Sequence, residues 1–381
     1  MKRWTQLVHF NPNPGDPYHP NCTPIYQTAT FAQKSPEMDL YDYTRSGNPT
    51  RTVLEQQLAR LEGGTSAFTF ASGMAALTAI IGLLSYGDHI IAGDDLYGGT
   101  HRLLSQRLPQ RGLQSTLVDT TDLNAVANAL RPETRMILIE TPSNPLQKIS
   151  DIKALAQLAH AQGAQLVVDN TFLSPWLQQP LSLGADIVIH SATKHLSGHS
   201  DVTAGVIIVN NLDTADRIAF IQNAEGSALA PFECWLLLKG LKTLGLRVER
   251  QQNTAEKIVT YLQNHPLIKK VYYPTLASHP GVDIQKRQAE GGGTVISFAT
   301  GSAKLSSRLV QSTQLFIKSV SFGSLTSLIS LPCAMSHASV ASEQRLFAAD
   351  LVRISIGIED AEDLILDLEQ AMAKLPLSQE A

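Results

Sequence analysis

The segment Asp169–Gly205 constrains this chain of 381 residues more than any other, because two mainly apolar runs end in polar residues there. The runs are Gln165–Val168 and Ile187–Ile189. Short apolar runs with polar residues after them predict buried strands of a parallel sheet. One strand would deliver Asp169 and the next the turn Ser191–Lys194 to the same sheet edge. Since open α/β sheets bind ligands at the carboxyl ends of their strands, we expect a ligand site there.

The residue types at this edge match the requirements of pyridoxal 5'-phosphate (PLP). Lys194 would form a Schiff base with the aldehyde, and Asp169 would keep the pyridine nitrogen protonated so that the ring accepts electrons. The hydroxyls of Ser191 and Thr193 would bind the phosphate. Each residue alone has a structural alternative, since a single Lys is usually solvated and a single Asp often caps a helix. The combination favours PLP.

A second phosphate contact is predicted where a short strand, Ala67–Phe70, leads into the helix that Ala71–Ala76 opens. A small, glycine-containing turn before a helix presents free backbone N–H groups and the positive end of the helix dipole to an anion. Gly73 and Met74 are therefore the predicted phosphate-binding backbone positions. The alternative is an ordinary helix start, because Ser-Gly is common there without any ligand.

Strand and helix patterns alternate from Thr50 to about Gly240, as in a doubly wound sheet. They predict an α/β large domain with a mostly parallel sheet and helices on both faces. The expected helices are Thr50–Glu62, His101–Arg107 and Ile152–Gln162, and the further expected strands are His89–Ala92, Met136–Glu140 and Val206–Val209.

The C-terminal third predicts a second, smaller α/β domain. Glu225–Arg250 is expected to form one long helix that connects the domains. Strands are expected in Gly291–Phe298 and Leu351–Ile358, followed by a terminal helix over Asp360–Leu375. Residues 1–49 lack periodicity and predict an extended arm. We expect three parts: an arm (1–49), a cofactor-binding large domain (50–244) and a small domain (245–381).

Composition excludes several function classes. The chain has 30 basic and 34 acidic residues, with a net charge of −4, so it carries no electrostatic signature for nucleic acid or an anionic membrane. Three cysteines without C-x-x-C spacing support neither disulfides nor a metal site. The first 20 residues contain no apolar core of signal-peptide length, and no segment approaches the eighteen uninterrupted apolar residues of a membrane span. We therefore expect a soluble cytoplasmic protein that binds a small molecule.

Nearly the whole chain resembles the Cys/Met metabolism PLP-dependent enzymes, a branch of the fold-type I superfamily. The motifs that carry the likeness are Tyr41–Arg51, Asp94–Gly99 and His190–Lys194. The resemblance implies the fold-type I architecture of a PLP-dependent transferase. It also implies that the arm reaches a neighbouring subunit, where Tyr43 and Arg45 contact the phosphate of that subunit's cofactor. A homodimer or homotetramer is expected on this basis.

The resemblance also assigns roles around the cofactor. Tyr97 would stack on the pyridine ring and take part in proton handling, although a Tyr in such a loop is often a packing residue. Asn144 would bond the cofactor's phenolic oxygen and the substrate carboxylate, with an Asx-type turn before Pro145 as its structural alternative. Ser321 would contribute to substrate binding.

Arg353 lies within an otherwise apolar strand pattern. A buried, unpaired charge is too costly to keep, so this side chain must have an anionic partner. A structural salt bridge to Glu359 or Asp360 is one interpretation. The resemblance implies the other, in which Arg353 binds the α-carboxylate of an amino acid substrate through two parallel hydrogen bonds.

The stretch Ser319–Ser339 bears on reaction type. Many relatives that act at Cγ carry a glutamate where this chain has Thr326, and some γ-synthases have an arginine at the position of Ser46. The stretch is instead similar to plant-type cystathionine β-lyases, which implies cleavage of cystathionine to homocysteine, pyruvate and ammonia in methionine biosynthesis. A γ-synthase or γ-lyase and a non-catalytic PLP-binding protein are the alternatives. Arg102 and Lys318 are candidate partners for the distal carboxylate.

Overall fold

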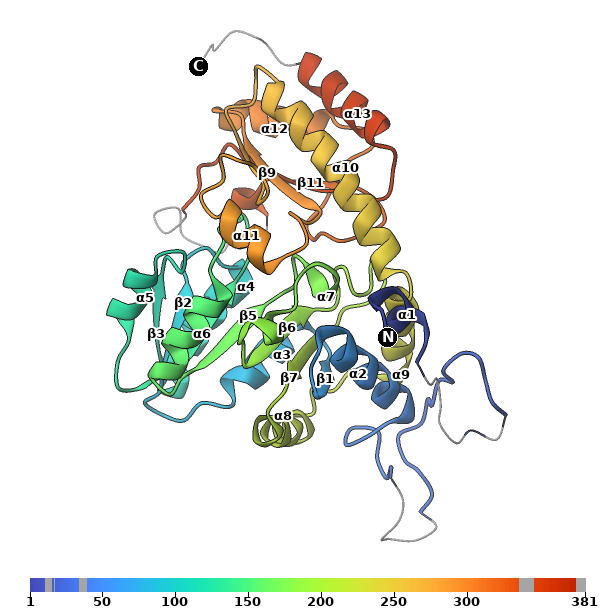
Figure 1. Cartoon of the computed structure of the whole chain (residues 1–381). Coiled ribbons are helices and arrows are strands. Elements are labelled where there is room, and N and C mark those ends of the chain that lie inside the picture. The colour runs from blue at the N-terminus through green and yellow to red at the C-terminus, as the bar shows by residue number, and fades with distance from the viewer. Residues whose placement is uncertain (11–15, 17, 34–39, 336–345, 375–381) are drawn as a thin grey trace.

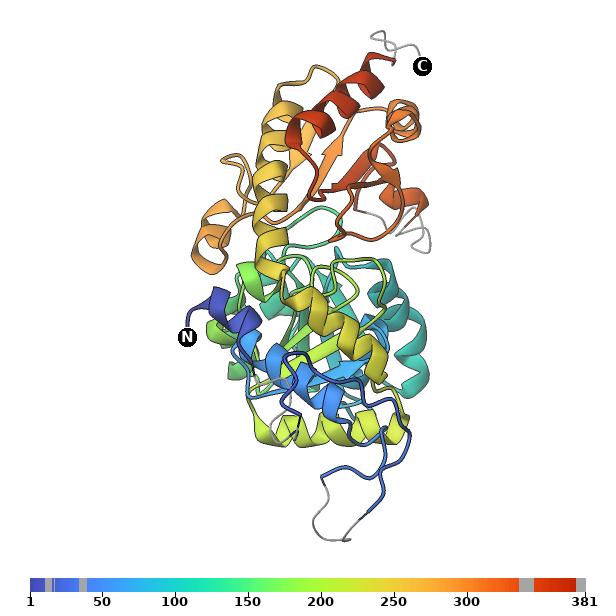
Figure 2. The ribbon, with the colours of Figure 1, turned by 90° about the vertical axis from the view of Figure 1, so that its right-hand side faces the viewer.

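The computed structural model describes residues 1–10, 16, 18–33, 40–335 and 346–374. Two α/β units, each with its own sheet, lie one above the other (Figure 1). The long helix α10 (Leu244–Asn264) runs from the lower unit along the upper one (Figure 2). The predicted boundary at residue 245 falls in the first turn of this helix, and we propose it as the division between large and small domains.

The large unit is built on a seven-stranded sheet in the order β1-β7-β6-β5-β4-β2-β3. Strands β3, β2, β4, β5 and β6 run parallel, whereas β7 is antiparallel to both of its neighbours. The mostly parallel sheet is therefore confirmed. The strands are β1 (Ser66–Phe70), β2 (His89–Gly93), β3 (Gln114–Val118), β4 (Thr134–Glu140), β5 (Gln165–Asp169), β6 (Ile187–Ser191) and β7 (Gly205–Val209).

Helices cover both faces of this sheet, as predicted. Alternate residues of one strand belong to opposite cores: Leu166 and Val168 of β5 face one cluster and Val167 the other. Period-two alternation in strands that are buried on both sides produces this arrangement. The helices of the large unit are α2 (Pro49–Glu62), α3 (Gly73–Ile81), α4 (Gly98–Arg102), α5 (Leu123–Ala129), α6 (Ile152–Ala161), α7 (Ser174–Leu177), α8 (Leu212–Glu225) and α9 (Pro231–Leu241).

Two predicted helices differ from the structure. The expected helix His101–Arg107 is α4 followed by a π-helical turn, Leu103–Arg107. The single helix expected over Glu225–Arg250 is wrong: α8 ends at Glu225, α9 begins at Pro231, and α10 begins at Leu244. Proline favours the first turn of a helix, where its missing N–H has no partner to lose, so Pro231 marks a start that hydrophobic periodicity does not reveal.

The small unit has a five-stranded sheet in the order β10-β11-β12-β9-β8, in which only β10 and β11 pair in parallel. Its core includes Phe298, Ile354 and Leu368. Both predicted strands and the terminal helix are present. The elements are β8 (Lys270–Tyr272), α11 (Val282–Gln288), β9 (Val295–Ala299), α12 (Ala303–Ser312), β10 (Ile317–Lys318), β11 (Leu328–Ser330), β12 (Leu351–Ser355) and α13 (Ala361–Ala373).

The N-terminal arm begins with a short helix, α1 (Arg3–Val8), which the absence of periodicity did not predict. The ring of Trp4 packs edge-on against Trp176, 4.6 Å away between centroids. Leu7 is buried in the core of the large unit. Aromatic and aliphatic packing thus holds the start of the arm against the large unit. The segment is too short to show a periodic pattern, so the sequence did not reveal this contact.

Candidate active site

A cavity of about 530 Å³ lies between the carboxyl edge of the large sheet and the small unit. Three neighbouring strands bring Glu140, Asp169 and Ile189 to it, and these residues are register partners across the sheet. Most predicted site residues meet here. The cavity is lined by Ser72, Gly73, Met74, Leu77, Tyr97, Thr100, Arg102, Glu140, Asn144, Asp169, Thr171, Phe172, Ile189, Ser191, Thr193, Lys194, Thr203, Val320, Ser321, Phe322, Met335 and Arg353.

Lys194 comes from the turn that follows β6, where its N–H bonds the carbonyl of Ser191. Its Nζ donates to the hydroxyl of Ser321 at 2.5 Å and lies 5.2 Å from the centre of the Phe322 ring. Burial, aided by the nearby Arg353 charge, lowers the pKa of this amine to about 8. A lysine with such a pKa is available as a neutral nucleophile and base near physiological pH.

Asp169 is the last residue of β5 and faces the cavity. It accepts hydrogen bonds from the backbone N–H and the hydroxyl of Thr171. The same hydroxyl accepts the N–H of Ser191 at 2.8 Å, so it links the ends of β5 and β6. Burial raises the pKa of Asp169. A cation placed against this carboxylate would favour its charged form, as a protonated pyridine nitrogen does.

The predicted phosphate contacts form one corner of the cavity. Ser72 caps α3 by accepting the N–H of Ala75 at 3.1 Å, and Gly73 and Met74 are the first residues of the helix. A Cβ added at Gly73 would lie 3.0 Å from the Cβ of Ser191, so the helix start and the end of β6 approach closely. Backbone N–H groups of a helix start next to hydroxyls suit an anion.

Thr193 stands beside this corner with its hydroxyl bound to the backbone of Ala204. Gly205, the residue after Ala204, lies against the start of α3, where an added Cβ would be 2.2 Å from the carbonyl oxygen of Ser72. Only glycine permits this approach of two backbones.

Arg353 extends from β12 of the small unit into the cavity and is only 3% exposed. It donates to Oδ1 of Asn144 at 2.8 Å and to the carbonyl of Ser321 at 3.1 Å. Both partners are neutral, and burial lowers the pKa of the guanidinium to about 10. This arrangement suits a carboxylate ligand that supplies the missing negative charge.

The salt-bridge interpretation of Arg353 is wrong. Glu359 binds the backbone N–H and hydroxyl of Ser327, and Asp360 pairs with Arg250. Both acidic residues that the sequence offered as partners therefore bind other groups. Strand β12 places Arg353 at the cavity, whereas these two residues follow the end of the strand.

Ser321 joins the two cationic side chains. It adopts φ +87°, a left-handed conformation that is rare outside glycine. In this conformation its hydroxyl receives Lys194 and its carbonyl receives Arg353. Strain of this kind persists where the surroundings fix it and is typical of functional sites.

Tyr97 lies between β2 and α4 and is 44% exposed in this single chain. Its ring packs over Gly99, where an added Cβ would be 2.4 Å from a ring carbon. The ring therefore stands at the mouth of the cavity, next to the phosphate corner.

Two predicted contacts lie outside this cavity. Arg45 donates to the carbonyl and Oδ1 of Asn223 at 2.6 and 2.9 Å, and its guanidinium packs on the ring of Tyr43. Both are exposed, and neither lines the site of their own chain. Their assignment to a neighbouring subunit's cofactor stays a prediction.

Among the other candidates, Arg102 lines the cavity, whereas Lys318 and Thr326 do not. Thr326 is exposed, directly before the buried Ser327. The positions of Ser336 to Ser339 in the motif that indicated a β-lyase lie outside the described residues.

Among the lining residues that sequence reasoning missed are Glu140, Thr171 and Phe322. The first two carried a readable signal, since Glu140 ends a buried strand at the predicted edge and Thr171 comes two residues after the end of another. Phe322 had none, because its stacking on Phe172 and its contact with Lys194 arise from the meeting of two distant segments.

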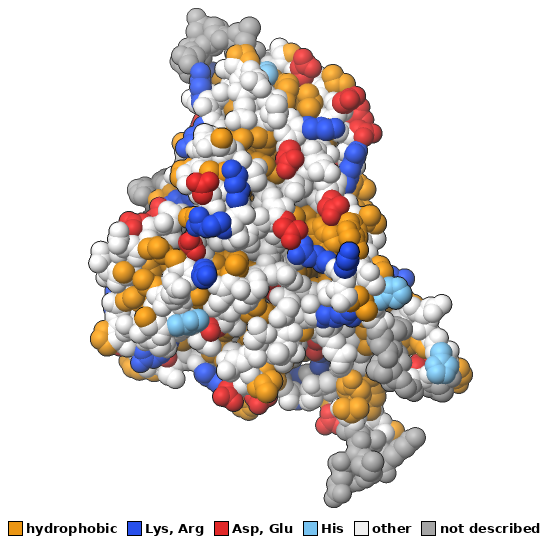
Figure 3. Space-filling view, viewed as in Figure 1, with side chains coloured by type: hydrophobic (Ala, Val, Ile, Leu, Met, Phe, Trp, Pro, Cys, Tyr) orange, Lys and Arg blue, Asp and Glu red, His pale blue; other side chains and the backbone are white. Residues whose placement is uncertain are grey.

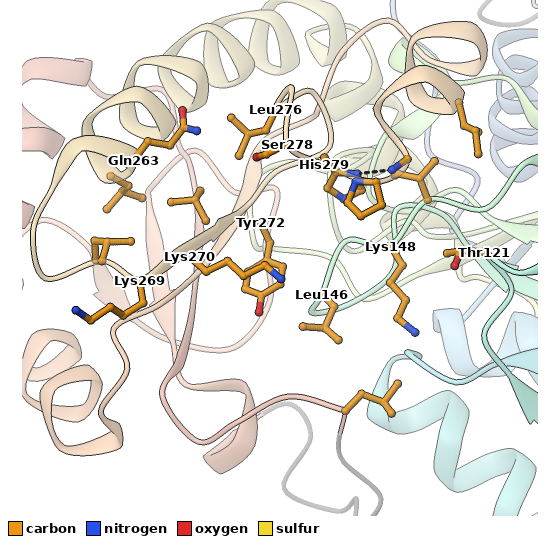
Figure 4. Close-up of a pocket in the computed structure, with 18 of the residues that line it drawn as sticks. Thr121, Leu146, Lys148, Gln263, Lys269, Lys270, Tyr272, Leu276, Ser278 and His279 are labelled. Carbon is orange, nitrogen blue, oxygen red and sulfur yellow. Dashed lines mark hydrogen bonds between the residues drawn. The ribbon is translucent and has the colours of Figure 1, made fainter.

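A second, larger cavity of about 810 Å³ lies between the units but holds none of the predicted site residues (Figure 4). Lys148 at its edge is paired with Asp94 and Asp119, at 3.0 and 2.9 Å. Basic and acidic side chains are interspersed over the face of the molecule that Figure 3 shows. In the described part of the chain, no group of three or more His, Cys, Asp or Glu could hold a metal ion. No described helix is long and apolar enough to cross a membrane.

The residues of the first cavity fit PLP. They provide a buried amine of lowered pKa and a helix start beside two hydroxyls. They also provide a carboxylate, Asp169, and a guanidinium, Arg353, neither of which forms an ion pair with another described residue. These groups correspond to the aldehyde, ring nitrogen and phosphate of the cofactor and to a substrate carboxylate.

Comparison with known proteins agrees. The family described as Cys/Met metabolism PLP-dependent enzyme matches residues 4–373. The chain is 54% identical to cystathionine beta-lyase, chloroplastic, of Arabidopsis thaliana over 98% of this chain and 81% of that protein. It is 44% identical to cystathionine gamma-lyase of Bacillus subtilis (strain 168) over 98% of this chain and 100% of that protein. The structure of cystathionine gamma-lyase from Lactobacillus plantarum, complexed with L-serine, superposes with a TM-score of 0.96 at 44% identity, covering 98% of this chain and 99% of that one.

Proposed function

We propose that this chain, which belongs to the Cys/Met metabolism PLP-dependent enzyme family, cleaves L-cystathionine by β-elimination. The chain is a PLP-dependent carbon–sulfur lyase of fold-type I, so the non-catalytic alternative is set aside. The proposed reaction takes cystathionine and water to homocysteine, pyruvate and ammonia. The observation that carries the lyase chemistry is that Lys194, Asp169 and Arg353 converge on one cavity.

The large unit would hold the cofactor. Lys194 would attach it covalently, Asp169 would pair with the ring nitrogen, and the phosphate would lie at Gly73 and Met74 with the hydroxyls of Ser191 and Thr193. Tyr97 would cover the ring. When bound, PLP supplies a carbon that holds the substrate's amino group and a protonated ring that accepts the electron pair released at Cα.

The small unit would orient the substrate. Arg353 would bind the α-carboxylate through both nitrogens, with Asn144 and Ser321 keeping the guanidinium in place. Charge-assisted, bidentate contacts restrict rotation about the bonds of the bound amino acid. The Cα–H bond can then be held toward the Lys194 amine, a positioning effect that lowers the barrier to proton removal.

Lys194 would move the protons. Once displaced by the substrate amine, its neutral Nζ can take the proton from Cα. The resulting ammonium can give that proton to the sulfur of homocysteine as the Cβ–S bond breaks. A pKa of about 8 allows the amine to serve as base and acid near neutral pH. Tyr97 is the second candidate for the proton donor at sulfur.

The distal end of cystathionine carries a second carboxylate. Arg102 supports this role because it lines the cavity and a guanidinium is the natural partner of a carboxylate. Lys318 is withdrawn as a candidate, since it lies on β10 and not at the cavity.

A γ-lyase is the second candidate function, favoured by the 44% identity to cystathionine gamma-lyase of Bacillus subtilis. The higher identity of 54% to the β-lyase of Arabidopsis thaliana supports the first. Location in the cytoplasm and assembly into a homotetramer stay predictions, and the Arabidopsis relative is described as chloroplastic.

Identification of the keto acid tests the proposal. The PLP-loaded protein is incubated with L-cystathionine, and the keto acid and thiol are determined. Pyruvate with homocysteine is expected. Production of 2-oxobutanoate with cysteine would replace β-elimination by γ-elimination, and the Lys194→Ala variant provides the blank for non-enzymatic breakdown.

A further inference from the structure

Glu140 is a buried carboxylate at the cavity to which none of the roles above has been given. It is the last residue of β4, lies beside Asp169 in the sheet register, and is 7% exposed. Its two oxygens accept the backbone N–H of Tyr97 at 3.0 and 3.1 Å, and the hydroxyl of Thr100 lies 3.5 Å from Oε1. The Glu140 carboxylate is therefore hydrogen-bonded to the loop that carries Tyr97.

Within the described part of the chain, this carboxylate has no cationic partner. Among the described residues, no Lys, Arg or His forms an ion pair with Glu140. Burial and the neighbouring Asp169 raise its pKa well above the usual value. Burying an unpaired carboxyl group next to another carboxylate is unfavourable for stability. A role in positioning explains why a polar acceptor stands here.

The backbone contact matters because little else fixes the ring of Tyr97. The side chain is 44% exposed, and its ring lies beside the backbone of Gly99. The residue is the N-cap of α4, a helix of only five residues. The hydrogen bond at its own N–H thus determines where the Cα, and with it the ring, stands over the cavity.

A second carboxylate fastens the same two loops in the opposite direction. Asp95, in the loop of Tyr97, accepts the hydroxyl of Ser143 and the N–H of Leu146 at 3.0 Å. Glu140 and Asp95 together connect the segment after β2 with the segment after β4, which bears Asn144. The loops that present Tyr97 and Asn144 are therefore held as one unit.

We propose that Glu140 is a positioning residue that fixes Tyr97 over the cofactor site by accepting the Tyr97 backbone N–H. The inference rests on the role proposed for Tyr97 but not on the choice between β- and γ-elimination. What the position requires is an acceptor of this length. Gln keeps one acceptor oxygen at the same reach, whereas Asp keeps the charge but withdraws it by one methylene.

Hydrogen–deuterium exchange of the Tyr97 amide tests the contact directly, in the full chain with and without PLP and without substrate. Glu140→Ala is expected to raise the exchange rate about tenfold or more, since the amide loses its acceptor. Glu140→Gln is expected to retain most of the protection. Glu133→Ala, an exposed acid just before the same strand, is the matched control. Unchanged exchange in Glu140→Ala would overturn the proposal.

Should the alanine variant not fold, the Asp and Gln variants decide. The proposal expects Gln to protect the Tyr97 amide and to keep kcat better than Asp. The reverse order would overturn it, because it would show that negative charge beside Asp169 is what the site needs.

A double-mutant cycle separates positioning from general stability. If Glu140 acts through Tyr97, Glu140→Ala should lower kcat severalfold in the native background and have little further effect on Tyr97→Ala. Equal losses in both backgrounds would overturn the proposal. The keto acid formed plays no part in this test, so a failure of the β-lyase proposal is recognised separately.

Discussion

The two walls of the cavity differ in how they are built. The wall from the large unit consists of strand ends and a helix start: Asp169 ends β5, Gly73 begins α3, and Lys194 lies in the turn after β6. The wall from the small unit depends on Ser321 in a left-handed conformation and on Arg353 from an antiparallel strand. We infer a division of labour in which the first wall retains the cofactor and the second orients the substrate. Substitutions in the two walls should therefore have different kinetic signatures.

Lys194→Ala should have the largest effect. Loss of the amine removes both the covalent attachment of PLP and the base, so turnover should fall by about 10⁴-fold, the upper range for acid–base catalysis. The visible absorbance of covalently held PLP should vanish with it. Pyruvate formation and the absorption spectrum measure the two losses. The exposed Lys269→Ala serves as control, and retained turnover in Lys194→Ala would refute the catalytic role.

Arg353→Lys should raise KM about 10²-fold while PLP remains bound, because a point charge cannot replace the bidentate guanidinium. Steady-state kinetics and the PLP content after dialysis measure both quantities. Arg250→Lys, which alters an exposed pair with Asp360 in the same unit, should leave KM unchanged. A loss of PLP without a change in KM would reverse the assignment of the two walls.

The pH dependence of cofactor capture should follow Lys194. Its lowered pKa of about 8 means that the neutral, reactive amine is scarce at low pH and dominates above pH 8. The rate of PLP recombination with the apoprotein should rise about tenfold between pH 7 and pH 9 and then level off. Capture by butylamine, measured in parallel, corrects for the titration of PLP. A rise that continues to pH 10 without levelling would contradict the lowered pKa.

Arg45→Ala should have the smallest effect, an increase of about fivefold in the dissociation constant of PLP, since an exposed charge contributes about 1 kcal/mol or less. The predicted cause is a contact with the cofactor of a neighbouring subunit, so the effect should appear only in an oligomer. Equilibrium dialysis measures it, with Arg308→Ala as an exposed control. Unchanged PLP affinity would remove the arm from the account of the site.

The difference between the two walls also explains which site residues could be predicted from the sequence. Asp169 and Lys194 were predictable because buried strands appear in the sequence as apolar runs. The residues at the end of such a run lie at the carboxyl edge of the sheet, where ligands bind. Glu140 satisfied the same rule and was overlooked. For Arg353, the apolar strand showed only that an anion was needed, and Glu359 seemed available until the structure placed it on Ser327. Which distant segment meets a strand end is a property of tertiary packing.

Helix boundaries show a related limit. The expected helix over Glu225–Arg250 joined α9 to α10 because apolar residues continue across the break at Lys242 and Thr243. Hydrophobic periodicity reports burial and not a change of direction. The start at Pro231 was visible in principle, since proline is favoured at a first helical turn.

The most direct test of the divided cavity compares PLP content and KM in two variants prepared together, Asp169→Asn and Arg353→Lys. The account predicts that Asp169→Asn loses PLP on dialysis, and that Arg353→Lys keeps it but needs about 10²-fold more cystathionine for half-maximal rate. If both variants lose PLP to the same extent, or if Asp169→Asn keeps PLP and raises only KM, the two walls do not divide cofactor and substrate between them.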